Sequence, residues 1–75
     1  MGEILRQPVS SSDIASIGYD AATETLEIEF KATGVYRYFS VPSTVAEEFG
    51  RTPSPGKFFR QHIKTKYAWE KVAGR

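Results

Sequence analysis

Residues 25–31 carry the pattern that most restricts the fold, because apolar and polar side chains alternate without a break along T-L-E-I-E-F-K. In an extended strand Leu26, Ile28 and Phe30 point to one side and the charged residues point to the other. Such a strand belongs to an antiparallel sheet that has one face on the core and one face in water. With 75 residues, 40% of them hydrophobic, the chain can build a single modest core.

Two similar runs flank this strand. Residues 13–19 show a period of two before a turn at 20–24, and residues 35–41, after a turn at 32–34, are rich in β-branched and aromatic side chains. Short turns between such runs favour an antiparallel meander. We therefore predict an α+β fold: a three-stranded antiparallel β-meander with two short helices packed on one face and a C-terminal tail.

Start and stop signals place the two helices. The first is predicted over residues 43–49, with a serine or threonine cap and with Gly50 as the stop. The second has Ser54 as its cap and Pro55 at its first helical position, and we expect it to end at residue 64 or 65.

The two ends of the chain lack a regular pattern. Residues 1–12, which contain three consecutive serines, are predicted to form an extended N-terminal arm, and residues 13–75 a single domain. In the tail, Tyr67, Trp69 and Val72 are expected to fold back and anchor on the core, and the alternative for Trp69 is a stacking role.

The length of the second hairpin loop decides which way Tyr36 and Tyr38 point. A three-residue loop with Gly34 in the left-handed conformation pairs Glu29 with Arg37 and places both tyrosines on the inner face. A two- or four-residue loop reverses the faces and puts Arg37 among apolar side chains, where an unpaired guanidinium is costly. We favour the inner position, in which the tyrosines pack in the core. On the outer face they would form a stacking platform for unpaired bases.

Charge is divided along the chain, although the net charge is only +1. Residues 1–49 hold three cationic and eight acidic side chains, whereas residues 50–75 hold seven cationic side chains and a single acidic one. This segregation indicates an anionic partner for the basic part of the chain.

The predicted second helix gathers part of that positive charge on the side opposite to its apolar residues, at about 100° per residue. A stripe of this kind binds phosphates by releasing their counterions. The alternative is an ordinary solvated helix face. The helix start at 54–57 is a further candidate for an anion, although a plain capped start explains it better. The predicted nucleic-acid contacts are Lys57, Arg60, Lys64, Arg51 and Lys66.

The residue types give little support for metal binding, disulfide formation or catalysis. There is no cysteine and one histidine, so neither a disulfide nor a metal site is expected, and His62 is predicted to be a partly buried structural residue. No nucleophile is paired with a base, so we predict no enzymatic activity and no cofactor. Apolar runs are too short for a membrane span or a secretory signal, and we expect a cytoplasmic location.

A set of ordered motifs runs from Ser11 to Tyr67. It comprises I-G-Y-D at 17–20, the strand at 26–30, G-V-Y-R-Y-F at 34–39, V-P at 41–42, and Ser54, Gly56, Phe58, Phe59 and Ile63. This set resembles the KTSC domain, which is named for the carboxyl end of some bacterial lysyl-tRNA synthetases and also occurs as small stand-alone bacterial proteins. The resemblance implies RNA binding and no catalytic residues. The chain departs from the family pattern at Arg60, where asparagine is common, and this copy is therefore more basic.

We therefore expect a small non-enzymatic module that binds nucleic acid, RNA rather than DNA, through the basic face of its second helix. The alternative is a protein-interaction or self-associating module with no nucleic-acid role. An exposed sheet edge can accept a partner strand, and the acidic half of one copy can meet the basic half of another.

Overall fold

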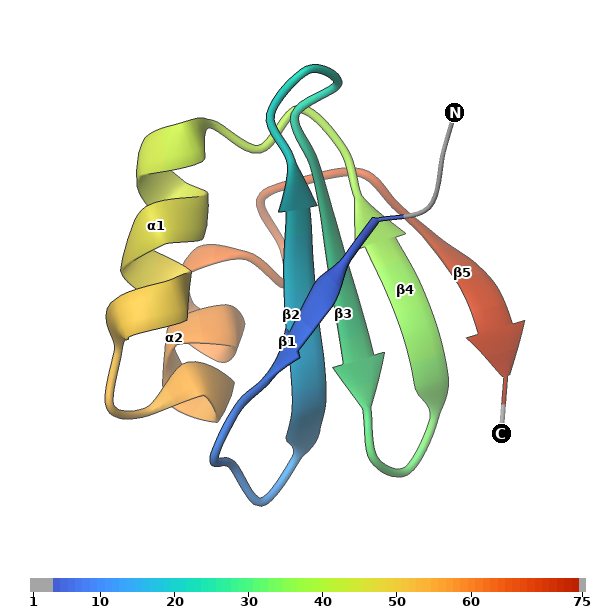
Figure 1. The fold of residues 1–75 in the computed structure, drawn as a ribbon, viewed down its shortest axis with the longest axis vertical. Coiled ribbons are helices and arrows are strands. Elements are labelled where there is room, and N and C mark those ends of the chain that lie inside the picture. Colours follow the sequence, from blue (N-terminus) through green and yellow to red (C-terminus); the bar gives the residue numbers. More distant parts are fainter. Residues whose placement is uncertain (1–3, 75) are drawn as a thin grey trace.

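Five antiparallel strands form one sheet in the computed structural model, which describes residues 4–74 (Figure 1). They lie side by side in chain order, as β1 (Arg6–Pro8), β2 (Ile14–Asp20), β3 (Thr25–Phe30), β4 (Gly34–Tyr38) and β5 (Trp69–Gly74). The fold remains α+β, but the predicted three-stranded meander is wrong, because segments at both ends of the chain add a strand.

The two additional strands are the edges of the sheet. β1 has three residues and lies within the predicted N-terminal arm, where it pairs with β2 from Arg6↔Gly18 to Pro8↔Ser16. β5 lies within the predicted tail, pairs with β4, and has all six of its residues exposed. Neither strand buries one side completely, so neither carries the alternation by which a strand is recognised in a sequence.

Two helices cover one face of the sheet, as predicted (Figure 1). The first, α1 (Ser43–Arg51), follows Pro42 as its N-cap and continues through Gly50, so the predicted stop at this glycine is wrong. It ends because Thr52 precedes a proline, which drives the residue before it to extended backbone; Thr52 has φ −65° and ψ 140°.

The second helix, α2 (Pro55–His62), has Ser54 at its N-cap and proline at its first position, as predicted. It ends at His62, two residues before Lys64, the earlier of the two predicted ends, and Ile63 is its C-cap. Neither α1 nor α2 is long and apolar enough to cross a bilayer, and residues 4–74 contain no other helix that is.

The core lies between the inner face of the sheet and the two helices. Its fully buried apolar side chains come from β2, β3, the β4–α1 connection, α1 and the turn after α2: Ile14, Leu26, Ile28, Val41, Phe49 and Ile63. Tyr38 on β4 and Phe59 on α2 complete the core at 4% and 8% exposure. The Tyr19 hydroxyl donates a hydrogen bond of 2.5 Å to the carbonyl oxygen of Val41 and ties β2 to the segment that leads into α1.

The loop between β3 and β4 has three residues, as predicted, but it comprises residues 31–33 rather than 32–34. Gly34 closes the ladder opposite Phe30, and its φ of 110° lies in a region that other residues rarely adopt. A Cβ atom at Gly34 would also strike the carbonyl oxygen of Ala73 on β5. Glycine is therefore required both by the turn and by the approach of the edge strand.

This shift of the loop changes which residues pair across β3 and β4, but each side chain stays on the face of the sheet that was predicted for it. Glu27, and not Glu29, lies opposite Arg37, so the predicted register is wrong by two residues. Because side-chain direction repeats every two residues, Tyr36 and Tyr38 keep the inner face that was predicted for them.

The outer face of the sheet carries a cluster of opposite charges. Glu27 is only 6% exposed, and its two carboxylate oxygens accept from Arg6 Nη1 at 3.1 Å and from Arg37 Nε at 2.8 Å. These ion pairs link β1, β3 and β4. They also mean that two of the three cations of the first 49 residues are neutralised within the acidic half of the chain.

Candidate nucleic-acid interface

The five cations predicted to contact nucleic acid are all exposed. Lys57 and Arg60 lie on α2, whereas Lys64 and Lys66 lie in the turn that follows it, and Arg51 is the last residue of α1. The turn is fixed by its backbone, since the N–H of Lys64 donates to the carbonyl of Phe59 at 2.9 Å and that of Lys66 to the carbonyl of Ile63 at 3.1 Å.

The structure brings Lys57 and Arg60 together at the start of α2. Both line a polar hollow of about 280 Å³ between this helix and residues 10–13 of the β1–β2 loop. Arg60 Nη1 lies 3.4 Å from Asp13 Oδ2, and both side chains are 59% exposed. An ion pair as exposed as this one contributes little to stability, so the guanidinium remains available to a phosphate.

The start of α2 is a poor separate site for an anion. A Cβ atom at Gly56 would lie 3.3 Å from Asp13 Oδ2, so a carboxylate already stands beside the free N–H groups of the first turn. The Ser54 side chain makes no capping hydrogen bond. The anion-binding hypothesis for residues 54–57 stays a prediction.

Lys64 faces a different part of the surface. It borders a groove of about 420 Å³ that is lined mainly by aromatic rings, with two threonines at its margin. Arg51 and Lys66 border neither this groove nor the polar hollow. The lining residues of the groove are Phe30, Thr33, Tyr36, Tyr38, Phe59, Lys64, Thr65 and Trp69.

The aromatic groove exists because the helices cover only part of the inner face. Figure 1 shows α1 and α2 on the side of β1 and β2, and β5 at the far edge. Trp69 on β5 is consequently 56% exposed, although it shares a face with the buried Tyr38, its cross-strand partner. Its ring centroid lies 5.5 Å from that of Tyr36.

The two tyrosines have different environments. Tyr38 is 4% exposed, and this burial, with a smaller contribution from Tyr36, raises the pKa of its hydroxyl to about 12. Tyr36 is half-buried and packs edge-on against Phe30 at 5.5 Å, while the Nζ of Lys71 lies 5.8 Å from its ring. Both tyrosines pack on the inner face, as we favoured, and Tyr36 also reaches an open surface.

Two other candidates differ from the sequence predictions. His62 is exposed rather than partly buried, and its ring lies 4.7 Å from that of Phe58. Trp69 and Val72, predicted as anchors on the core, are 56% and 41% exposed, whereas Tyr67 does pack against it. The surface that Trp69 forms with Lys71 beside Tyr36 was not predicted from the sequence. The two residues are two positions apart, and in a strand this spacing places both side chains on the same side, which would have indicated the surface.

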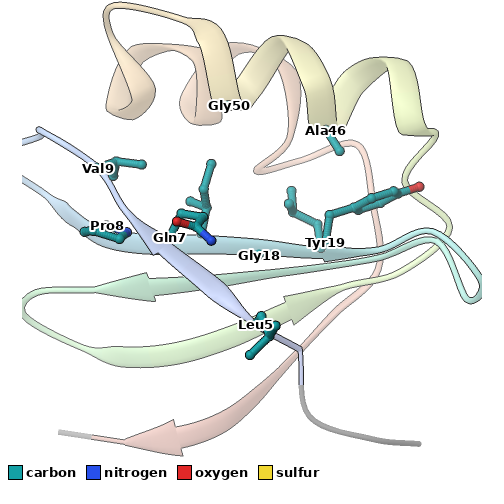
Figure 2. A pocket seen from close by; sticks show the side chains of 10 residues that line it. Leu5, Gln7, Pro8, Val9, Gly18, Tyr19, Ala46 and Gly50 are labelled. Carbon is teal, nitrogen blue, oxygen red and sulfur yellow. The ribbon is translucent and has the colours of Figure 1, made fainter.

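An apolar hollow of about 300 Å³ lies elsewhere, between α1 and strands β1 and β2 (Figure 2). Figure 2 shows Val9, Gln7 and Tyr19 on the sheet side and Ala46 on the helix side. No cation lines this hollow, so it is separate from the basic surface. Within residues 4–74 no three histidine, aspartate or glutamate side chains come together in a way that could hold a metal ion.

Known proteins resemble both the sequence and the fold. The profile of the KTSC domain matches residues 10–67. The crystal structure of a KTSC domain protein from Yersinia pestis has a TM-score of 0.92 and 44% sequence identity, and the match covers 95% of this chain and 100% of that one. An uncharacterised protein of Stutzerimonas stutzeri is 36% identical over 62 residues, which cover 83% of this chain and 87% of that protein.

Larger proteins contain a similar segment. A lysine–tRNA ligase of Trichormus variabilis is 42% identical over 62 residues, and one of Nostoc punctiforme is 40% identical over 62 residues. These matches cover 83% of this chain but only 11% of each ligase. Since the profile matches most of the sequence and the fold agrees over nearly its whole length, the chain belongs to the KTSC domain family.

Proposed function

We propose that this protein is a non-catalytic cytoplasmic module that binds single-stranded RNA through five exposed cations, Lys57, Arg60, Lys64, Arg51 and Lys66. The observation that carries the proposal is the pattern of ion pairs. Arg6 and Arg37 are held by Glu27, whereas among the described residues only one of the five predicted contacts, Arg60, forms an ion pair. The positive charge of the final third is thus largely free to attract phosphates.

The similarity to segments of lysine–tRNA ligases supports RNA as the nucleic acid. The chain spans about a tenth of the length of these relatives, so ligation itself is not part of the proposal. A module of this kind would bind the backbone without reading the sequence, since counterion release depends on the number of phosphates and not on the bases.

Salt dependence tests the mechanism. If about four phosphates are engaged, log K for a single-stranded RNA falls with log salt at a slope of roughly −3. Filter retention of a labelled oligonucleotide at several salt concentrations measures this slope. A flat salt response would exclude binding by these cations.

A charge-neutralised variant tests the surface itself. We expect Lys57→Gln/Arg60→Gln/Lys64→Gln to weaken retention and to make the slope less steep by up to about 2, since each lost phosphate contact removes about 0.7. The control is Ala21→Glu/Ala22→Glu/Ser43→Glu, which changes the net charge equally at exposed positions of the β2–β3 turn and the start of α1. Equal loss in both variants would show a general charge effect and no defined surface.

Self-association is the second candidate function, and the edge strand β5 favours it. β5 is six residues long, is exposed throughout, and has β4 on one side only. The opposite edge, β1, has three residues including Pro8, which lacks the N–H that a partner strand needs. Sedimentation at low and high salt, with and without an oligonucleotide, separates the two functions. A dimer that does not bind RNA would support self-association and contradict RNA binding.

A further inference from the structure

The aromatic groove between α2 and β5 has the composition of a binding site rather than of a core. Its rings form a continuous series: Trp69 to Tyr36 at 5.5 Å, Tyr36 to Phe30 at 5.5 Å, and Phe30 to Phe59 at 5.0 Å. The series begins in the core, where Phe59 is 8% exposed, and ends at Trp69, which is 56% exposed. The outermost ring therefore has one side packed on protein and much of its surface in water.

One cation lines this groove and a second lies beside one of its rings. Lys64 lines it directly, and Lys71 lies above the Tyr36 ring with its Nζ 5.8 Å from the centroid. No ion pair holds either lysine within residues 4–74. The only acidic side chain after residue 50, Glu70, follows Trp69 on β5 and points to the opposite face, where it lies across from Arg37. A ligand of the groove is therefore expected to combine a flat apolar part with negative charge.

An unpaired nucleotide has this combination. Its base presents a flat π-surface that stacks on aromatic side chains, and its phosphate is attracted by neighbouring lysines. The groove volume of about 420 Å³ lies within the range of sites for small ligands, and Thr33 and Thr65 place hydroxyl groups at its margin. A base inside a duplex is stacked and paired, so only a single strand can supply it.

We propose that the groove receives one unpaired base of a bound RNA strand, which stacks on Trp69 while Lys64 and Lys71 contact the adjoining phosphates. This inference rests on the proposed function and adds a second kind of contact to it. The basic residues of α2 hold the backbone, and the groove holds a base, so a strand would run from the polar hollow at Lys57 and Arg60 towards β5.

The single tryptophan of the chain makes the inference directly measurable. Stacking of a base on Trp69 is expected to quench its fluorescence. The probes are a short oligouridylate and an abasic oligonucleotide with the same number of phosphates. We expect the oligouridylate to quench the emission and to bind more tightly than the abasic strand by about 5- to 150-fold, the range for one stacked base.

A variant series provides the second measurement. Trp69→Leu is expected to weaken oligouridylate binding by a similar factor without changing the affinity for the abasic strand. Trp69→Phe is expected to bind the oligouridylate with an affinity between those of the wild type and Trp69→Leu. The matched control is Leu5→Ala, which removes another exposed large apolar side chain, 84% exposed, at the opposite side of the sheet. The control should bind both strands as the wild type does.

The outcomes separate the two proposals. Salt-dependent binding of both strands with equal affinity and unchanged Trp69 emission would overturn the base-stacking groove and leave phosphate binding intact. No salt-dependent binding of either strand would overturn the proposed function, and the groove proposal with it. Quenching by the oligouridylate alone, lost affinity in Trp69→Leu and normal binding by Leu5→Ala would support both.

Discussion

Removing the carboxylate of Asp13 should increase the affinity for nucleic acid. Among residues 4–74, Asp13 is the one acidic side chain that forms an ion pair with a predicted phosphate contact, and its Oδ2 lies 3.4 Å from Arg60 Nη1. A phosphate that binds Arg60 therefore lies close to this carboxylate and is repelled by it. Asp13→Asn keeps the size of the side chain and removes the competing charge.

The magnitude follows from the salt relation. Asp13→Asn relieves Arg60 of this competition, and the gain is at most that of one full phosphate contact: about 0.7 in the slope of log K against log salt, which at about 0.1 M salt corresponds to binding up to roughly fivefold tighter. Because both partners are 59% exposed, the free energy of unfolding should change by less than about 1 kcal/mol. The affinity gain therefore appears without a measurable loss of fold.

Filter retention of a single-stranded RNA at several salt concentrations measures both the affinity and the slope. The matched control is Glu24→Gln, which makes the same change in net charge in the β2–β3 turn, at the end of the sheet away from the β1–β2 loop (Figure 1). An equal gain in both variants, or no gain in Asp13→Asn, would refute the assignment of Arg60 as a phosphate contact.

Three further predictions concern stability. Because burial raises the pKa of Tyr38 to about 12 from an unfolded value of 10.0, deprotonation favours the unfolded chain. Between neutral pH and pH 11 the ionisation of Tyr38 alone should lower the free energy of unfolding by about 1.4 kcal/mol. Urea titrations at the two pH values measure this loss, and the Tyr38→Phe variant should lack it. Glu27→Gln removes the buried carboxylate charge that pairs with Arg6 and Arg37 and should lower the urea midpoint by the equivalent of about 1–3 kcal/mol; an unchanged midpoint would contradict this. Gly18→Ala would push a methyl group into the backbone just before β1, so amide exchange should lose protection in β1 while the other strands keep theirs.

The central elements of the fold were predictable because each packs apolar side chains of one side against the core. β3 has Leu26 and Ile28 in the core, and the alternation that results is visible in the sequence. The start of α2 was equally clear from Ser54 and Pro55. The edge strands were not predictable, because β1 and β5 are held by backbone pairing with their neighbours and not by a buried apolar side.

Two local errors have simple physical causes. Gly50 is exposed with no neighbouring atom near its Cβ position, so it can remain helical, and the stop comes instead from Pro53 acting on Thr52. The register of β3 and β4 depends on which three residues form the loop, and shifting the loop by one residue moves every cross-strand pair by two without exchanging the faces.

The candidate site was only partly visible in the sequence. The exposure of the cations on α2 follows from helical periodicity, which places them away from Phe59. The aromatic groove does not follow from any local pattern, because its walls come from β3, β4, α2 and β5 and meet only when the tail joins the sheet. The tail was expected to bury Trp69, and its pairing with β4 leaves that side chain in water instead.

An NMR titration of the labelled protein with a short single-stranded RNA would map every proposed contact at once. We predict that the amide signals of Lys57, Arg60 and Lys64 shift first, that the Trp69 indole signal shifts with them, and that all return towards their free positions as salt is added. Shifts confined to the outer face around Glu27, or no shifts at low salt, would contradict it.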